Sequence, residues 1–139
     1  MYNIFKIWNM IKRIPTHEKI SDLLTSISNP VRVQILLAIG NGEACVCHLE
    51  SLLELRQAYI SQQLMILRKK KIITSRREGK YIYYRLVNPE VLEVLRAAGE
   101  IMGVPKDSFV IQDHSNCECP KCNIETENIP TDLPVREQA

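Results

Sequence analysis

Five cysteines are the residues of this 139-residue chain whose type and spacing offer the most chemistry. Two form the motif Cys45-Val-Cys47, and three lie near the C-terminus at Cys117, Cys119 and Cys122. A secreted disulfide framework is usually shorter and has an even number of cysteines. Closely spaced thiols in a chain with no recognisable export signal instead indicate a site for a soft metal ion, or a redox switch.

The two-residue spacing of Cys45 and Cys47 limits the backbone that can support a shared site. In an α-helix these side chains would point about 200° apart, whereas in an extended segment they point to the same side. The helix-breaking sequence Gly40-Asn-Gly42 precedes them. We therefore expect an extended or helix-starting backbone, where a helix N-terminus also favours thiolates. Two thiolates are too few for a tight site, so we expect further ligands from the C-terminal cysteines, within one subunit or across two.

The elements around this motif follow from caps, breakers and apolar periodicity. Asn29 and Pro30 predict the start of a helix that runs to Gly40. We expect helices over residues 3–13, 17–27, 30–39, from about 47 to 54, 58–69 and from about 89 to 103. In the helix expected over residues 58–69, the buried stripe consists of Ile60, Leu64 and Leu67.

The apolar period changes after residue 71. Residues 72–77 and 81–86 are rich in β-branched or aromatic side chains, and Glu78-Gly-Lys80 between them predicts a hairpin turn. Two helices followed by a basic hairpin predict a winged helix-turn-helix. The expected fold class is therefore mainly α with a small β-hairpin wing, in a dimer. We expect one DNA-binding and dimerisation domain over residues 1–104 and a flexible, cysteine-containing tail over residues 105–139.

The net charge of +2 conceals a strong asymmetry. Residues 56–85 carry nine basic side chains and one acidic one, whereas the chain from Asp113 onward carries six acidic and two basic ones. A basic centre of this kind favours a polyanionic partner, here double-stranded DNA, over a merely solvated face. The 45% hydrophobic and 24% charged residues are typical of a soluble globular protein. Without an apolar run of about 18 residues, we expect the protein in the cytoplasm.

The predicted second helix of the helix-turn-helix offers polar side chains opposite its buried stripe. Glutamine can bond adenine through two hydrogen bonds, and serine can serve either kind of base pair. Lysine and arginine near such a helix and in a wing suit DNA phosphates. The candidates for base or sugar contacts are Gln57, Ala58, Tyr59, Ser61 and Gln62, and those for phosphate contacts are Arg68, Lys69, Lys70, Arg76, Arg77 and Lys80.

Three ordered motifs resemble the ArsR/SmtB family of metal-responsive repressors. They are Ser28-Asn-Pro-Val-Arg-Val-Gln-Ile-Leu36, Leu53-Glu-Leu-Arg-Gln-Ala-Tyr-Ile-Ser-Gln-Gln-Leu-Met-Ile-Leu67 and Arg77-Glu-Gly-Lys-Tyr-Ile-Tyr-Tyr-Arg-Leu86. The resemblance covers roughly residues 20–102 and implies a winged helix-turn-helix repressor. Two residues depart from the family pattern: Gln63 stands where histidine is common, and Lys71 where glycine is usual.

The resemblance also implies a role for the thiols. The sequence Glu43-Ala-Cys-Val-Cys-His-Leu49 is similar to a position at which family members sense thiophilic ions. Arsenite and antimonite favour three thiolates, and the family's arsenic-type third cysteine is replaced here by Glu50. The missing ligand would then come from the tail. Residues 89–103 contain no aspartate, histidine or cysteine, which argues against the family's zinc site on the last helix. His48 and His114 lie beside the cysteines as auxiliary candidates, although surface positions are more typical.

Three functions follow as hypotheses. The first is a homodimeric repressor released from operator DNA by As(III)/Sb(III) or Cd(II)/Pb(II), with Zn(II) a weaker candidate. The second has the same fold but uses the cysteines as a redox or persulfide switch. The third is a small thiol enzyme, which the sequence does not favour because it lacks a phosphate loop, an HExxH motif and an oriented Cys–His pair.

Overall fold

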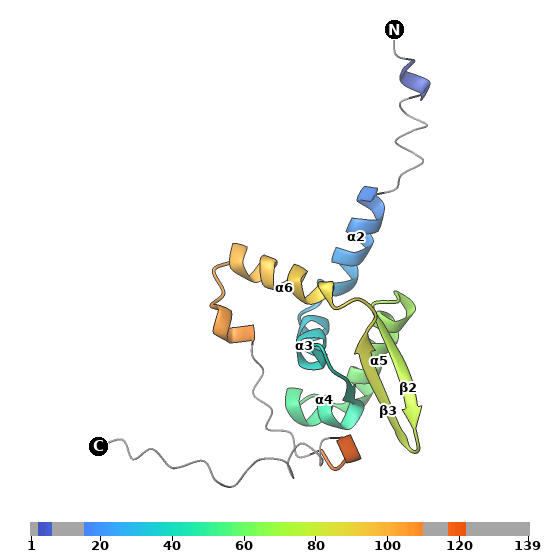
Figure 1. The fold of residues 1–139 in the computed structure, drawn as a ribbon, viewed down its shortest axis with the longest axis vertical. Helices are drawn as coiled ribbons and strands as arrows, with labels where there is room; N and C mark the ends of the chain where they lie inside the picture. Colours follow the sequence, from blue (N-terminus) through green and yellow to red (C-terminus); the bar gives the residue numbers. More distant parts are fainter. Residues whose placement is uncertain (1–2, 7–15, 110–116, 122–139) are drawn as a thin grey trace, which may run out of the picture.

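The computed structural model of the protein describes residues 3–6, 16–109 and 117–121 (Figure 1). Its elements are α2 (Thr16–Ile27), α3 (Pro30–Ile39), β1 (Ala44–Cys45), α4 (Val46–Leu53), α5 (Gln57–Lys69), β2 (Ile73–Glu78), β3 (Tyr81–Leu86), α6 (Glu90–Ile101) and the short 3₁₀ helix η1 (Lys106–Phe109). This confirms the predicted class, mainly α with a hairpin wing. Of the helix expected over residues 3–13, residues 4–6 are helical and 7–15 lie outside the described residues.

Helix α3 begins and ends as its sequence predicts. The Asn29 side chain accepts hydrogen bonds from the backbone N–H groups of Val31 and Arg32, at 2.9 and 3.3 Å, and Pro30 occupies the first helical position. At the other end Gly40 has φ 55°, a left-handed conformation in which glycine avoids a steric penalty. The chain therefore turns sharply just before the Cys45-Val-Cys47 motif.

The wing is part of a three-stranded antiparallel sheet with the order β1-β3-β2. Strands β2 and β3 form the expected hairpin, with Gly79 at its tip in a left-handed conformation. Strand β1 pairs Ala44 with Tyr84 and Cys45 with Tyr83. The sequence prediction missed β1, because two residues are too few to show strand periodicity. This strand attaches the first cysteine directly to the wing.

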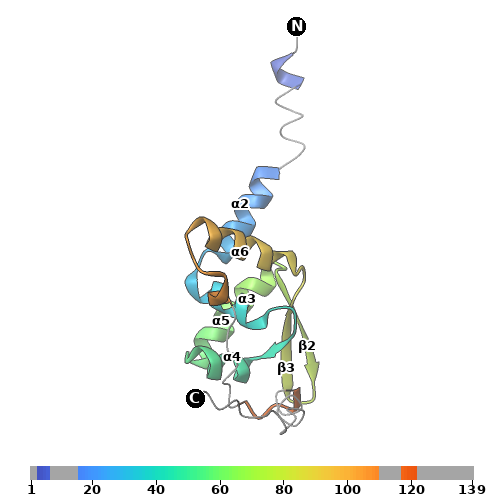
Figure 2. The same ribbon diagram turned by 60° about the vertical axis from the view of Figure 1, so that its left-hand side comes forward.

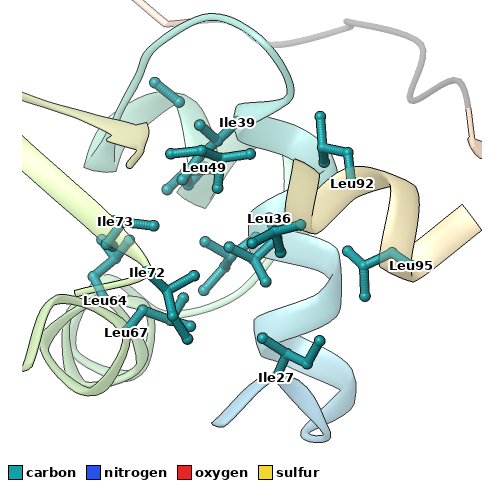
Figure 3. Close-up of a cluster of buried hydrophobic side chains, with 14 of the residues drawn as sticks. Ile27, Leu36, Ile39, Leu49, Leu64, Leu67, Ile72, Ile73, Leu92 and Leu95 are labelled. Atoms are coloured by element: carbon teal, nitrogen blue, oxygen red, sulfur yellow. The ribbon is translucent and has the colours of Figure 1, made fainter. Parts of the chain in front are cut away.

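The hydrophobic core lies between α3, α4, α5, α6 and the first residues of β2 (Figure 3). The predicted stripe of Ile60, Leu64 and Leu67 is almost completely buried, which confirms the orientation expected for α5. Leu36 on α3 and Leu49 on α4 are fully buried beside this stripe. Burial of such side chains contributes about 1.5–3 kcal/mol each. The core therefore fixes α4 and α5 as one helix-turn-helix unit.

Helices α2 and α6 lie at one end of the domain, while α4 and the wing tip lie at the other (Figures 1 and 2). Residues 117–121, drawn in orange-red, return to the end that carries α4 and the wing. Cys117 and Cys119 are buried there, in one cluster with Cys45 and Tyr83. These five residues of the predicted tail are therefore packed on the domain. Within the described ranges, we find no helix with the length and apolar character needed to cross a membrane.

Candidate metal centre and nucleic-acid interface

Four cysteines converge at the junction of β1, α4 and segment 117–121. The Sγ atom of Cys47 lies 2.8 Å from that of Cys45 and 2.7 Å from that of Cys117. The Sγ atoms of Cys45 and Cys117 are 3.4 Å apart. With Cys119, all four sulfur atoms lie within 4.8 Å of one another. The structure thus brings together four of the five predicted thiol ligands in one chain, and Cys122 lies outside the described residues.

The local backbone places Cys45 and Cys47 on the same side, as their spacing requires. Cys45 is the N-cap of α4, with the extended angles φ −85° and ψ 164°, and its Sγ atom accepts the backbone N–H of His48 at 3.4 Å. Cys47 follows in the first turn of the helix. The extended and helix-starting backbone predicted for this motif is therefore confirmed. Helix N-termini stabilise negative charge, so this position suits thiolate ligands.

The donor set fits a soft metal or metalloid ion. With metal–sulfur bonds of about 2.3 Å, two thiolates on one ion lie no more than about 4.6 Å apart. The four sulfur atoms lie within 4.8 Å of one another, which is close to this limit. Three thiols in mutual contact suit a trigonal ion, and the fourth also allows a tetrahedral one. His48 is not part of this cluster, and His114 lies outside the described residues.

The surroundings of Cys45 and Cys117 favour the protonated forms of these two thiols. Burial, and then a hydrogen bond with Cys47, raise the pKa of Cys45 far above its ordinary value of 9.0. The same two causes raise the pKa of Cys117 to about 11. A cation in the cluster would reverse this preference by stabilising the thiolates. Binding of an ion would therefore release protons.

A charged and aromatic group that the sequence analysis missed surrounds the thiols. The Glu43 carboxylate accepts hydrogen bonds from Arg76 Nε at 2.9 Å and Nη2 at 2.7 Å, and from Lys121 Nζ at 3.1 Å. The Arg76 and Lys121 cations lie 4.7 and 5.9 Å from the centre of the Tyr83 ring. Hydrogen bonds from Arg76, and less from Lys121, lower the pKa of Glu43 to about 2.

Tyr83 connects this group to the thiols. Burial, and then the nearby charge of Cys119 and a hydrogen bond with its thiol, raise the pKa of Tyr83 to about 12. The only sequence signals for these residues were the position of Glu43 two residues before Cys45 and the aromatic alternation in β3. Neither signal reveals that Lys121, far along the chain, would reach the same carboxylate.

The predicted base-contacting face of α5 is accessible. Gln57, Ala58, Tyr59 and Gln62 are exposed, and Ser61 is half-buried. Arg56 caps the helix without a side-chain hydrogen bond. The first two turns of α5 therefore expose mainly polar side chains, which suits a helix that enters the major groove.

The predicted phosphate-contacting cations differ in their environments. Arg68 and Lys69 are exposed in the last turn of α5, and Lys80 lies 5.4 Å from the Tyr81 ring at the wing tip. Arg77 Nε donates to the backbone carbonyl of Gly79 at 3.2 Å. Two others are ion-paired: Lys70 with Asp22 at 2.6 Å, and Arg76 with Glu43 and Glu78. The positive charges of these two residues are therefore partly neutralised within the protein.

Comparisons with known proteins agree with this architecture. Residues 29–75 match the sequence profile described as "Bacterial regulatory protein, arsR family". Over 100 residues the chain is 33% identical to the biofilm growth-associated repressor of Agrobacterium fabrum, covering 69% of this chain and 86% of that protein. The chain belongs to the ArsR/SmtB family. It is thus a member of a family of transcriptional regulators, which are not enzymes.

Two further ArsR/SmtB comparisons extend the result. Over 66 residues, 47% of this chain and 51% of the other, the chain is 44% identical to the arsenic resistance transcriptional regulator ArsR1 of Pseudomonas putida. The crystal structure of the transcriptional repressor BigR from Xylella fastidiosa matches with a TM-score of 0.58 and 33% identity, over 67% of this chain and 92% of that one. The winged helix-turn-helix fold is therefore shared with repressors of known structure.

The two departures from the ArsR/SmtB pattern have distinct structural settings. Gln63 is buried on α5, and its Oε1 atom accepts a hydrogen bond from Arg32 Nη1 at 3.0 Å. Arg32 Nε also donates to the Ser26 carbonyl at 2.6 Å, so this contact joins α5 to the end of α2. Lys71 has φ 57°, in the region that glycine favours. The side chain at position 63 therefore faces the interior and not the DNA.

Proposed function

We propose that this chain is a metal(loid)-responsive repressor. As a homodimer it binds operator DNA in the ion-free state, and a thiophilic ion held by Cys45, Cys47 and Cys117 releases it. The observation that carries this proposal is the convergence of four thiols at the start of α4 in a winged helix-turn-helix fold. Thiolates select soft ions, and the neighbouring α4 packs directly on the DNA-contacting α5.

Ion binding can be coupled to DNA release only if the ion favours one of two protein conformations. The thiols belong to two separate pieces of chain, namely the continuous junction of β1 and α4, and segment 117–121. An ion that joins them fixes the position of α4 relative to the wing. A coupling free energy of about 1–3 kcal/mol changes operator affinity by about 5–150-fold. This magnitude is sufficient for a switch in transcription.

The thiol number supports two classes of inducer. As(III) or Sb(III) would take three sulfur ligands, and the mutual contacts of Cys45, Cys47 and Cys117 supply them. Cd(II) or Pb(II) would also use Cys119. Zn(II) is a weaker candidate, because residues 89–103 contain no aspartate, histidine or cysteine for the family's zinc site on the last helix. The likeness to the regulator named for arsenic resistance supports the first class.

A second copy of the chain is the proposed partner at the α2–α6 end. Ile20 and Leu24 on α2 are about half exposed, whereas Ile101 and Met102 at the end of α6 are 84% and 79% exposed. Apolar side chains gathered on neighbouring helices mark a protein interface. A two-fold pairing through this end would leave α5 and the wing of each copy free to contact one half-site of the operator.

The test replaces Cys45 and Cys47 together by serine. Operator binding, measured by fluorescence anisotropy with a labelled duplex, should be retained, whereas arsenite or Cd²⁺ should no longer release the DNA. Cys119→Ser serves as the matched control. It should leave release by arsenite intact if three thiols are the ligands, and weaken release by Cd²⁺. Normal release of the Cys45/Cys47 double variant would refute the proposal.

A redox switch is the second candidate, favoured by the 2.7 Å contact between the sulfur atoms of Cys47 and Cys117. An oxidant such as a peroxide would take two electrons from the two thiols as their S–H bonds break, an S–S bond forms and two protons leave. A persulfide would instead need a sulfane-sulfur donor, whose S–S bond breaks as its outer sulfur atom is transferred to one cysteine thiolate. The raised pKa values of Cys45 and Cys117 disfavour it, because the reactive form is the thiolate. Anaerobic titration with the ion, followed by mass spectrometry, separates the candidates: DNA release with an S–S bond and no bound ion supports the redox switch.

A further inference from the structure

The Glu43 carboxylate is the meeting point of three parts of the molecule. It lies immediately before β1 and binds Arg76 of wing strand β2 through two guanidinium nitrogens. It also accepts a hydrogen bond from Lys121 of segment 117–121, the segment that carries Cys117 and Cys119. The Glu43 side chain is only 15% exposed. One partly buried carboxylate thus joins the segment that carries the tail thiols to the wing.

Arg76 is held by two carboxylates in this arrangement, although its side chain is 47% exposed. Its Nε and Nη2 groups donate to Glu43, its Nη1 group donates to Glu78 at 2.7 Å, and its guanidinium lies over the Tyr83 ring. A DNA phosphate would have to compete with these carboxylates for the positive charge of Arg76. Glu78 is 68% exposed and would be displaced readily. Glu43 is therefore the residue that decides whether Arg76 is available.

Assembly of the thiols controls how well Glu43 is covered. Lys121 follows Cys119 by two residues, and its ammonium group reaches both Glu43 and the Tyr83 ring. When segment 117–121 is docked through Cys117 and Cys119, Lys121 lies against Glu43, and the Glu43–Arg76 pair is less accessible to water. When the segment leaves, that pair becomes an exposed ion pair, which is weak and screened by salt. A phosphate can then compete for Arg76.

We propose that Glu43 is a positioning residue that transmits the state of the thiol cluster to the wing by withholding Arg76 from DNA. This inference rests on the proposed function and specifies its regulation. With the thiols gathered on an ion, segment 117–121 stays docked and Arg76 remains on Glu43. Without the ion, nothing but its own packing holds segment 117–121 in place, so the segment leaves more readily and Arg76 becomes available to a phosphate. Each time an ion gathers the thiols, the wing therefore loses one phosphate contact.

The test compares Glu43→Gln with the wild-type chain, using arsenite and Cd²⁺ as probes. Ion binding, read from thiolate charge-transfer absorption, should be retained because all thiols are intact, and operator affinity without the ion should be unchanged. The loss of operator affinity caused by the ion should be about five-fold smaller in the variant, the lower end of typical allosteric coupling. Lys121→Gln should act in the same direction with a smaller effect, and provides a second variant if the first folds poorly.

The salt dependence of operator binding gives a readout that a merely structural role would not change. In the ion-loaded state the slope of log affinity against log salt should be steeper for Glu43→Gln by about 0.9, the value for one additional phosphate contact. Arg77→Gln is the matched control on the same strand. It should lower operator affinity equally with and without the ion.

A double-variant comparison isolates the path through Arg76. In an Arg76→Gln background, the Glu43→Gln substitution should have no further effect on release. A persisting effect, or equal release of wild type and Glu43→Gln, overturns the inference while leaving the proposed function intact. If the ion fails to release the wild-type chain, the proposed function itself is wrong. The two failures are therefore distinguishable.

Discussion

At the scale of single residues, Cys45 and Cys117 lie where metal ligands would, but their surroundings favour the protonated thiol over the thiolate that binds an ion. Cys45 and Cys117 are buried with their sulfur atoms 3.4 Å apart, and burial raises the pKa of both. Such thiols resist ionisation until a cation arrives. This property favours selective response to a thiophilic ion over indiscriminate reaction with oxidants.

The apparent ion affinity should rise with pH. Thiols with raised pKa values hold their protons at neutral pH, so ion binding must expel protons, and a higher pH lowers that cost. Because the pKa of Cys117 is raised from its ordinary value of 9.0 to about 11, the ion affinity should continue to rise as the pH increases from 9 toward about 11. Titrations of Cd²⁺ at several pH values, followed by thiolate absorption, measure the slope. An affinity independent of pH between 6 and 9 would show that the ligands are already ionised.

At the scale of elements, the end of helix α5 carries a strained residue. The Lys71 N–H donates to the Arg68 carbonyl and the Ile72 N–H to the Leu67 carbonyl, both at 3.0 Å. This pattern requires a left-handed residue at position 71, where Lys71 has φ 57°. A side chain in this conformation costs roughly 1–2 kcal/mol that glycine avoids.

Lys71→Gly should therefore stabilise the protein by about 1 kcal/mol, because it relieves this strain at the end of α5. Chemical denaturation of the ion-free protein measures the change in the free energy of unfolding. Lys71→Ala is the matched control, since it removes the same charge but keeps a Cβ atom, and it should bring no gain. Equal stabilisation by both variants would assign the effect to charge.

At the scale of the whole molecule, the domain has two functional ends. The α4–α5 unit, the wing and the thiols lie at one end, and the exposed apolar ends of α2 and α6 lie at the other (Figure 2). Gly99 on α6 lies against Phe109, so η1 packs beside this second end. The arrangement separates the proposed dimer contact from the proposed DNA contact.

Ile101→Glu combined with Met102→Glu should weaken self-association by roughly ten-fold or more, because an unpaired charge buried in an interface costs about 1–3 kcal/mol or more. Sedimentation equilibrium measures the dimer dissociation constant, and operator affinity should fall with it. Val87→Glu, at an exposed apolar residue near the wing base, is the control and should leave association unchanged. A double variant that dimerises normally would place the interface elsewhere.

Much of the fold was predictable because its signals are local. Asn29 and Pro30 cap a helix through their own backbone contacts, and the periodic spacing of Ile60, Leu64 and Leu67 specifies which face of α5 is buried. The extended start at Cys45 followed from the preceding glycines and the two-residue spacing of the thiols. These features depend on neighbours within a few residues, so the sequence determines them directly.

The completion of the site was decided only by the tertiary structure. Cys117 and Cys119 were candidates by chemistry, but their approach to Cys45 spans more than 70 residues and depends on how segment 117–121 packs against β3. Strand β1 is too short to have a sequence signal, and Glu43 gains its role only through Arg76 and Lys121. Contacts between distant segments arise from packing of the whole chain, which no local pattern records.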